Sequence, residues 1–497
     1  MTDRPNPRNF CAKACRQVGH AGVARFEITT KNRRRMISTS TPARVAIIGG
    51  GVTGLTAAWH LHCAGLAPTV LERSARPGGV VGAARSGEWL HELGPNSLLE
   101  GSPEVAAFID EIGLGPRRLY AAPAAQQRYV VRRGRLVAMP TSPFAFVGTR
   151  LFSLAAKLRL LGEPWRARGP ADAEETVADF VVRRLGPEFL DYAINPFVAG
   201  VYAGNPRLLA VRHAFPKLHA IEQEHGSLIR GALKRRNTSG GPQGRIFSFP
   251  EGLGEIPATL ASRLGAAVQL QSHVKSVQRT GDGWRLSVER GGAIATADFD
   301  AVICALPADA LAGLHFEGVP GAERLALLRE IKHPPVASVF SGYRRDQVAH
   351  PLDGFGVLMP EVEAGRILGT LFSSTLFPGR APAGHVALTT FVGGMRAPEL
   401  AGLDDDALRR LVQAELERLL GVRGEPAYFR IQRWPRAIPQ YTVGYQRFKD
   451  IMLAVETAAP GLFAGGNCRD GISLANCLGA GQRLAGAVRA WAAANRA

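Results

Sequence analysis

Hydrophobic and polar positions first form a clear pattern at residues 43–48, where a short run of apolar and β-branched side chains predicts a buried strand. A glycine-rich turn follows at 49–54, and residues 55–66 repeat apolar side chains at helical spacing. A second short strand is predicted at 69–71 and ends in Glu72. This order of strand, tight turn, helix and strand is typical of the first unit of a dinucleotide-binding domain.

The remaining pattern predicts a helical lobe and a mixed sheet. It also predicts two later segments of the chain that add strands to the first sheet. The segment 143–165 is the most amphipathic part of the helical stretch, and a charged helix at 404–420 interrupts the strands of a later lobe. We therefore predict an α/β fold with a discontinuous Rossmann-like domain, a mixed-sheet substrate domain and a helical lobe suited to contact with a membrane. The predicted bounds are 43–102, 245–320 and 451–497 for the Rossmann-like domain, 103–236 for the helical lobe and 321–450 for the substrate domain.

Composition limits the classes of partner. The 497 residues are 46% hydrophobic, which is enough apolar material to bury a large core. The formal charge is +18, but the first 43 residues hold nine basic and two acidic side chains, and the rest of the excess is scattered. A scattered excess lacks the clustered stripe with interleaved aromatics that nucleic-acid binding needs, so no nucleic-acid partner is expected. A basic surface suits anionic lipid or a carboxylate-bearing substrate.

The cysteines and the apolar runs indicate a location. The six cysteines show no paired CxxC spacing, so a reducing compartment and no metal site are expected. No run of about eighteen uncharged apolar residues is present. Residues 1–42 are Arg-rich and acid-poor, which is typical either of a transit peptide or of sequence upstream of a start at Met36. We expect a cytoplasmic protein, peripheral on the inner face of a bacterial cell membrane, or on an organelle membrane if the tail is a transit peptide.

The glycine turn has the spacing of a pyrophosphate site. Gly49, Gly51 and Gly54 let the backbone approach a phosphate closely, and the start of the next helix offers free N–H groups and a partial positive charge. Glu72 stands where a carboxylate accepts hydrogen bonds from both ribose hydroxyls, and its charge repels a 2′-phosphate. The turn therefore predicts an ADP-containing cofactor other than NADP, with NAD and FAD both open at this point.

A second strand, turn and helix near the C-terminus favours FAD. Residues 464–474 place a glycine turn before a helix predicted at 472–491, where a simple NAD domain has nothing comparable. The start of that helix can direct its amides at a flavin ring and stabilise the negative charge of the reduced form. A packing helix with a glycine-rich entry is the alternative. Cys468 lies in this turn, but a lone cysteine is more often a small buried residue, so non-covalent FAD is expected.

Four further motifs carry a resemblance to a known family. They are Asn195-Pro196-Phe197-Val198-Ala199-Gly200-Val201-Tyr202-Ala203-Gly204, Glu222-Gln223-Glu224-His225-Gly226-Ser227-Leu228-Ile229-Arg230-Gly231, Phe355-Gly356-Val357-Leu358 and Gly369-Thr370-Leu371-Phe372-Ser373-Ser374. Together with the glycine turn, they resemble the protoporphyrinogen/coproporphyrinogen oxidase family, which are oxygen-dependent, FAD-containing enzymes of the amine-oxidase-like flavoprotein superfamily. The resemblance covers nearly everything from residue 43 to residue 497 and does not extend to the tail.

The resemblance implies a substrate site and a flavin site, but no obligatory catalytic side chain. Arg128 matches the family arginine that pairs with a substrate propionate, and Leu358, Leu371 and Phe391 match the apolar residues that sandwich the macrocycle. On the residues alone, these three apolar side chains would be interpreted as core. The flavin contacts implied by the turn, the C-terminal segment and the resemblance are Gly49, Gly50, Gly51, Val52, Thr53, Gly54, Glu72, Arg73, Gly79, Gly94, Pro95, Asn96, Ser97, Val274, Trp434, Asn467, Ile472, Ser473 and Leu474.

The activity that the resemblance implies is the six-electron oxidation of protoporphyrinogen IX to protoporphyrin IX in haem synthesis, with O2 as acceptor and H2O2 as by-product. Oxidation of coproporphyrinogen III by the same chemistry stays open. More distant alternatives are an amine oxidase or carotenoid desaturase, and a non-enzymatic binding protein of the GDP-dissociation-inhibitor type. Besides the porphyrinogen and O2, the partners to consider are a membrane surface, a second copy of the chain and a ferrochelatase that receives the product.

Overall fold

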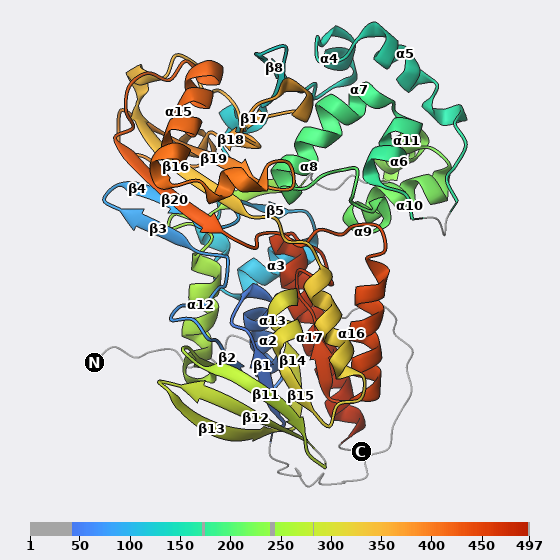
Figure 1. Cartoon of the computed structure of the whole chain (residues 1–497), viewed down its shortest axis with the longest axis vertical. Coiled ribbons are helices and arrows are strands. Elements are labelled where there is room, and N and C mark those ends of the chain that lie inside the picture. The colour runs from blue at the N-terminus through green and yellow to red at the C-terminus, as the bar shows by residue number, and fades with distance from the viewer. Residues whose placement is uncertain (1–41, 171–173, 239–243, 282, 496–497) are drawn as a thin grey trace, which may run out of the picture.

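A five-stranded parallel sheet forms the frame of the lower half of the molecule in Figure 1. The structure is a computed structural model, and it describes residues 42–170, 174–238, 244–281 and 283–495. The sheet has the order β10-β2-β1-β14-β21 and draws its strands from three separated stretches of the chain. The strands are β1 (Arg44–Ile48), β2 (Ala67–Leu71), β10 (Val268–Gln269), β14 (Ala301–Cys304) and β21 (Leu462–Ala464). This arrangement confirms the predicted α/β class; the predicted tail 1–42 falls almost wholly outside the described residues.

Alternate side chains of β1 serve two separate cores. Val45 and Ile47 pack with the helices on one face of the sheet, whereas Ala46 and Ile48 pack into the core on the other. The first core is built with α2 (Val52–Cys63), α3 (Pro103–Glu111), α12 (Glu255–Leu264) and α17 (Leu474–Ala494). The second holds α13 (Ala308–Gly313), α16 (Gln446–Ala458) and a four-stranded sheet of β11 (His273–Arg279), β12 (Trp284–Arg290), β13 (Ala293–Phe299) and β15 (His315–Glu317).

The C-terminal helix α17 lies directly against α2. A Cβ atom on Gly481 of α17 would stand 2.5 Å from the carbonyl oxygen of Thr53, so only glycine permits this approach. The Thr53 hydroxyl donates a hydrogen bond of 3.2 Å to the carbonyl oxygen of Cys477. The last segment of the chain is therefore held against the helix that follows the predicted phosphate turn.

A seven-stranded mixed sheet forms the upper half of the molecule on the side of α15 (Figure 1). Its order is β20-β16-β19-β18-β17-β7-β8. One face packs through Val339, Val357 and Val392 against the apolar side of α15 (Asp405–Leu420). The strands are β7 (Arg128–Arg132), β8 (Arg135–Ala138), β16 (Val336–Arg344), β17 (Gly356–Leu358), β18 (Gly369–Leu371), β19 (His385–Gly393) and β20 (Tyr428–Trp434).

Strands β7 and β8 lie within the stretch that the pattern predicts to be mostly helical, and they belong to the sheet instead. They form a hairpin whose turn residues Arg133 and Gly134 both have positive φ, at 51° and 70°. Two central turn residues with positive φ match the right-handed twist of paired strands. Val130 and Val131 are fully buried on opposite faces, so tertiary burial of a four- or five-residue run decides its conformation here.

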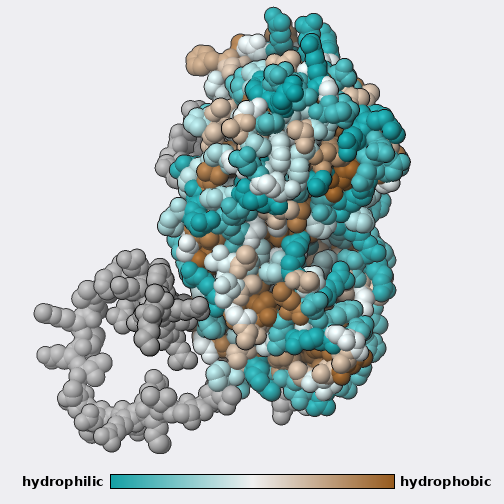
Figure 2. Space-filling model, turned by 90° about the vertical axis from the view of Figure 1, so that its left-hand side faces the viewer, coloured by the Kyte–Doolittle hydropathy of each residue, from teal (hydrophilic) through white to brown (hydrophobic). Residues whose placement is uncertain are grey.

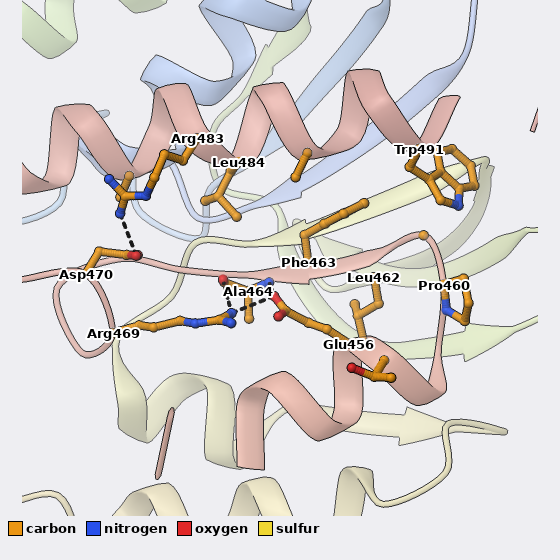
Figure 3. Close-up of a pocket in the computed structure, with 14 residues that line it drawn as sticks. Glu456, Pro460, Leu462, Phe463, Ala464, Arg469, Asp470, Arg483, Leu484 and Trp491 are labelled. Carbon is orange, nitrogen blue, oxygen red and sulfur yellow. Dashed lines mark hydrogen bonds and ion pairs between the residues drawn. The ribbon is translucent and has the colours of Figure 1, made fainter. Parts of the chain in front are cut away.

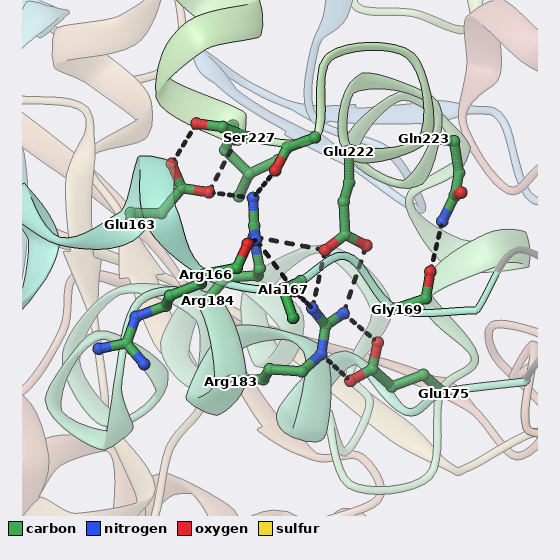
Figure 4. Close-up of polar contacts among 12 residues, drawn as sticks. Glu163, Arg166, Ala167, Gly169, Glu175, Arg183, Arg184, Glu222, Gln223 and Ser227 are labelled. Atoms are coloured by element: carbon green, nitrogen blue, oxygen red, sulfur yellow. Dashed lines mark hydrogen bonds and ion pairs between the residues drawn. The ribbon is translucent and has the colours of Figure 1, made fainter.

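The helical lobe occupies the upper right of Figure 1 and is held by buried ion pairs (Figure 4). Arg184 and Glu163 are fully buried and 2.6 Å apart, and Glu222 links Arg184 to Arg183. Glu163 also accepts hydrogen bonds from the first two N–H groups of α11, at Leu228 and Ile229. The lobe consists of α4 (Pro143–Gly148), α5 (Leu154–Leu161), α6 (Val177–Arg184), α7 (Pro187–Phe189), α8 (Asn195–Tyr202), α9 (Val211–Ala214), α10 (Pro216–His225) and α11 (Leu228–Thr238).

Short hairpins and loops connect the two halves. These elements are β3 (Ala83–Ser86), β4 (Trp89–Glu92), β5 (Leu98–Glu100), β6 (Leu119–Tyr120), β9 (Arg245–Ser248) and α14 (Ser373–Leu376). On the side shown in Figure 2, hydrophilic residues predominate and hydrophobic residues form small separate patches. Within the described ranges, no helix has both the length and the apolar character to cross a membrane.

Candidate functional site

The glycine turn between β1 and α2 is closed on its inner side and open on its outer side. A Cβ on Gly50 would stand 2.8 Å from Cβ of Glu72, and one on Gly54 would stand 2.0 Å from the carbonyl oxygen of Gly49. A Cβ on Gly51 would meet no atom within 4 Å. The first turn of α2, Val52 to Gly54, has neither a side-chain cap nor an acidic residue. The turn therefore presents helix amides to open space, as an anionic diphosphate requires.

Glu72 lies buried at the end of β2, next to this turn. One carboxylate oxygen accepts a hydrogen bond of 2.7 Å from the Gly50 N–H, and the other accepts from the Ser74 N–H at 2.8 Å. These bonds hold the carboxylate at the position predicted for ribose recognition. Arg73, the next residue, is exposed at the rim.

Two loops and a strand of the upper sheet meet beside the turn. Gly78 donates its N–H to the Gly50 carbonyl at 2.8 Å, and Gly79 follows with φ of 60°. A Cβ on Gly94 would stand 2.2 Å from the carbonyl oxygen of Val80, so the loop 94–97, which contains Pro95, Asn96 and Ser97, lies against the same segment. Trp434, at the end of β20, donates its indole N–H to the Leu93 carbonyl at 2.7 Å. The structure thus brings these predicted flavin residues together from both halves of the chain.

The C-terminal turn is held from behind by two tyrosines. The Tyr441 hydroxyl donates to the Asn467 carbonyl and accepts from the Gly471 N–H, and the Tyr445 hydroxyl donates to the Cys468 carbonyl at 2.7 Å. Burial raises the pKa of both phenols, so they remain neutral donors. These tyrosines carry no signal in the sequence, because each is more than twenty residues from its partner and neither belongs to a motif.

The remaining residues of the predicted flavin shell line the same end of the parallel sheet. Ser473 caps α17 by accepting from the Asn476 N–H at 3.1 Å, Leu474 is buried in the core shared with α2, and Ile472 packs beside the second core. Val274 of β11 is buried in that second core, two residues after Ser272, whose N–H bonds to the Glu72 carbonyl. Burial raises the pKa of the Cys468 thiol to about 12, which keeps it protonated and unreactive.

The four predicted substrate residues share one face of the seven-stranded sheet. Gly356 of β17 lies opposite both Arg128 and Leu371, and Gly369 of β18 lies opposite both Leu358 and Phe391. Directly opposed residues point to the same face, and so do residues two apart in a strand. Arg128, Leu358, Leu371 and Phe391 therefore project from the face that is turned away from α15. Gly356 and Gly369, which lie between these residues, add no side chain to this face.

The same face reaches the predicted flavin loops through Trp434. Phe391 pairs with Ser338, and Trp434 pairs with Val336, two residues away on β16. The other end of this face is already covered, because the Trp89 ring of β4 stacks on Tyr428 with centroids 5.4 Å apart. The rest of this face extends from Arg128, which is exposed, to Trp434, and its apolar side chains are half-buried. We call this region, made of Arg128, Leu358, Leu371, Phe391 and Trp434, the slot.

A cavity of about 510 Å³ lies away from the slot, between α16, β21 and α17 (Figure 3). Its lining includes Phe463, Leu484 and Trp491 and two ion pairs, Arg469 with Glu456 and Arg483 with Asp470. These pairs neutralise one another and leave no unpaired charge toward a ligand. This cavity therefore adds nothing to the predicted flavin or substrate chemistry.

The sequence pattern of the family described as flavin containing amine oxidoreductase matches residues 52–489. The chain belongs to this family. Protoporphyrinogen oxidase 2, chloroplastic/mitochondrial, of Arabidopsis thaliana is 34% identical over 472 residues, which cover 89% of this chain and 93% of that protein. Coproporphyrinogen III oxidase of Bacillus subtilis (strain 168) is 28% identical over 460 residues, covering 88% of this chain and 96% of that protein.

A crystal structure from Exiguobacterium sp. 255-15, provisionally described as a protoporphyrinogen oxidase, has a TM-score of 0.76 at 24% identity and covers 90% of this chain and 99% of that chain. It shows that the fold is shared. As a member of the flavin containing amine oxidoreductases, the chain is an FAD-dependent oxidoreductase. The open turn, the held carboxylate and the converging loops fit that cofactor, and the non-enzymatic alternative is set aside.

Proposed function

We propose that this enzyme oxidises protoporphyrinogen IX to protoporphyrin IX with O2 as the acceptor. The observation that carries the proposal is the placement of one cation and three apolar side chains on a single sheet face that ends at Trp434. Relatives named protoporphyrinogen oxidase from plants and from Homo sapiens, at 34% and 30% identity, support it. Because a relative named coproporphyrinogen III oxidase is 28% identical, coproporphyrinogen III is the alternative substrate.

Each residue of the slot has a role in this reaction. Arg128 is exposed, lies over the Phe355 ring at 5.2 Å and has no acidic partner among the described residues, so its guanidinium is free for a carboxylate. Leu358, Leu371 and Phe391 exclude water from the macrocycle and orient one of its methylene bridges. Trp434 links the slot to the loop 94–97.

Held by the glycine turn, Glu72 and the loop 94–97, FAD would supply a two-electron acceptor that O2 can reoxidise. The full conversion removes six hydrogens from the macrocycle and reduces three O2 to three H2O2. The proton released in each round needs an acceptor, and the slot face offers no carboxylate, so solvent at the open Arg128 end accepts it. The chain's own contribution is binding, orientation and exclusion of water.

Arg128→Ala tests this assignment directly. Loss of a charge-assisted contact is expected to lower kcat/KM for protoporphyrinogen IX roughly 10- to 100-fold, mainly through KM. Arg135→Ala, at an exposed arginine in the partner strand of the same hairpin, serves as the control and should stay near wild type. Porphyrin fluorescence growth under air measures both. A flavin-loaded wild type that oxidises neither protoporphyrinogen IX nor coproporphyrinogen III would overturn the proposed function.

We further propose that the helical lobe rests on a membrane surface. Helices α4 and α5 and the following turn expose large apolar side chains, with Phe144 91% and Trp165 80% exposed. Val147, Leu154, Leu158 and Leu161 extend this exposed apolar surface, and Arg150 lies exposed between the two helices. Apolar side chains beside basic ones suit an anionic bilayer. A second copy and a ferrochelatase remain predictions from the resemblance.

Sedimentation with phosphatidylglycerol vesicles tests the membrane proposal. Phe144→Asp together with Trp165→Asp should weaken binding more than tenfold, because each side chain contributes about 1.5–3 kcal/mol when buried. Leu233→Asp, at a 59% exposed leucine of α11 in the same lobe, is the control. Equal binding by the double variant and the control would contradict the membrane contact.

A further inference from the structure

Helix α8 presents a partly exposed apolar strip beside the slot. Val198 and Ala199 are buried, whereas Phe197, Gly200 and Val201 are exposed on the opposite side, with Phe197 at 43% and Val201 at 42%. Positions 197, 200 and 201 are three or four apart and so share one helix face. We call these three residues the α8 strip. A partly exposed phenylalanine and valine on one helix face offer an apolar contact to a molecule bound in the slot.

The α8 strip is continuous with the slot. A Cβ added to Gly200 would stand 2.7 Å from Cδ2 of Leu358, one of the apolar slot residues. Leu358 therefore contacts the strip at Gly200, and Phe197 and Val201 lie three residues before and one residue after this contact on the helix. Arg128 stands opposite Gly356, two residues before Leu358 on β17, which is about 7 Å along the strand. The α8 strip thus borders the slot at Leu358, about 7 Å along the strand from the position of Arg128.

The α8 strip itself carries no cation for a carboxylate. Residues 195–202 contain no charged side chain, and the Tyr202 hydroxyl is engaged by the Ala214 carbonyl at 2.7 Å. Arg132, on the same sheet face as Arg128, is paired with Glu188 at 2.5 Å. Arg396 donates to the Met359 carbonyl and to the Asn195 side chain. Both arginines are therefore already bonded to groups of the protein itself.

We infer that the slot selects a macrocycle whose carboxylates lie on one edge only, with the α8 strip contacting the uncharged edge. This inference rests on the proposed function. Protoporphyrinogen IX carries both propionates on one side and vinyl groups on the other. Coproporphyrinogen III carries one propionate on each of its four pyrroles, so every orientation places a carboxylate near Phe197 and Val201. Burial of an unpaired charge is costly, so this substrate is discriminated against.

The test introduces a cation at the strip. Val201→Lys and, separately, Phe197→Lys should lower kcat/KM for protoporphyrinogen IX and raise the ratio of coproporphyrinogen III to protoporphyrinogen IX turnover roughly tenfold, as expected for one new charge-assisted contact. The control is Leu453→Lys, at a 54% exposed leucine of α16 on the other half of the molecule. Bound flavin absorbance verifies that each variant is folded.

A binding measurement separates recognition from turnover. Quenching of protein fluorescence by protoporphyrin IX and by coproporphyrin III gives dissociation constants for ligands that cannot be oxidised further, and the lysine variants should shift them in the same direction. Wild type that turns over both porphyrinogens with equal kcat/KM, or lysine variants with an unchanged ratio, would overturn the inference while leaving the oxidase function intact. Lysine variants that change only vesicle binding would assign the strip to lipid and overturn it as well.

Discussion

At the scale of single residues, Glu92 and Arg380 form a buried contact between the two halves of the molecule. Glu92 ends β4, just before the loop 94–97, and its carboxylate accepts from the Leu253 N–H at 3.0 Å and from Arg380 at 3.4 Å. Burial raises the pKa of Glu92 to about 7, although Arg380 and the hydrogen bonds oppose this rise. Glu92 is therefore the carboxyl group here whose protonation changes near neutral pH.

The raised pKa of Glu92 predicts a pH-dependent stability. Between its ordinary value of 4.5 and about 7, the folded protein holds this proton and the unfolded chain does not. The free energy of unfolding therefore falls as pH rises through this window, by at most on the order of 3 kcal/mol from this group. Glu92→Gln removes the titration, so wild type should lose stability relative to this variant between about pH 4.5 and pH 7. Urea unfolding at a series of pH values measures the difference.

Other carboxylates also titrate, so the comparison needs a matched variant. Glu88→Gln, at the exposed turn before β4, should unfold in parallel with wild type at every pH. If the wild-type and Glu92→Gln curves also ran parallel, the raised pKa would be wrong.

What the sequence could predict at this scale depended on distance along the chain. The glycines at 49–54 and Glu72 belong to one short unit, so their joint chemistry is visible as a motif, and the structure places them together. Arg380 lies 288 residues from Glu92, and only the fold brings them into contact. Arg128 and the apolar slot residues came from the resemblance, because exposed arginines and half-buried leucines carry no local signal.

At the scale of elements, the edge strand β21 is closed by side chains in place of a further strand. The Ala464 N–H donates to Glu456 at 2.6 Å, and the Ala464 carbonyl accepts from Arg469 at 2.7 Å (Figure 3). Glu456 and Arg469 also pair with each other at 2.6 Å. An open strand edge is a template for intermolecular pairing, and this ion pair blocks it.

Arg469→Met is therefore expected to destabilise the protein and promote association. It leaves the Ala464 carbonyl and the half-buried Glu456 without their cationic donor, which costs about 1–3 kcal/mol. Urea unfolding and light scattering on warming measure the two effects. Arg483→Met removes a more exposed partner of Asp470 in the same cavity and should change stability by less than about 1 kcal/mol. Equal effects of the two substitutions would contradict the role of Arg469 at the strand edge.

The sequence predicted the long helices correctly, because their hydrophobic periodicity extends over many residues. It did not predict short strands whose conformation depends on burial against distant parts of the chain. The charged helix predicted at 404–420 is α15 at Asp405–Leu420, and the helix predicted at 472–491 is α17 at Leu474–Ala494. The hairpin β7–β8 was missed because its strands are only four or five residues long and cross a basic turn. Helix α16 at Gln446–Ala458 was also missed, since the predicted boundary at 450–451 divided its pattern.

At the scale of the whole molecule, the sequence indicated separate lobes but not how they meet. The meeting point is built from contacts between distant segments: Trp434 with Leu93, Trp89 with Tyr428 and Glu92 with Arg380. These three contacts are spread along β4 and the residue after it. The flavin loop is therefore attached to the upper sheet at its entry, and FAD binding and the packing of the two halves should be coupled.

Trp434→Phe tests this coupling, because it removes the 2.7 Å hydrogen bond to Leu93 and keeps most of the apolar volume. Loss of one neutral hydrogen bond is expected to raise the Kd for FAD two- to tenfold. Recovery of flavin fluorescence on dilution measures this Kd. The thermal shift between the FAD-free and FAD-bound protein should shrink by the same free energy, because ligand stabilisation follows affinity. Trp165→Phe, at the exposed tryptophan of the helical lobe, should leave both quantities unchanged. A Trp434→Phe variant that matched this control in affinity and in thermal shift would show that the two halves hold the flavin loop independently.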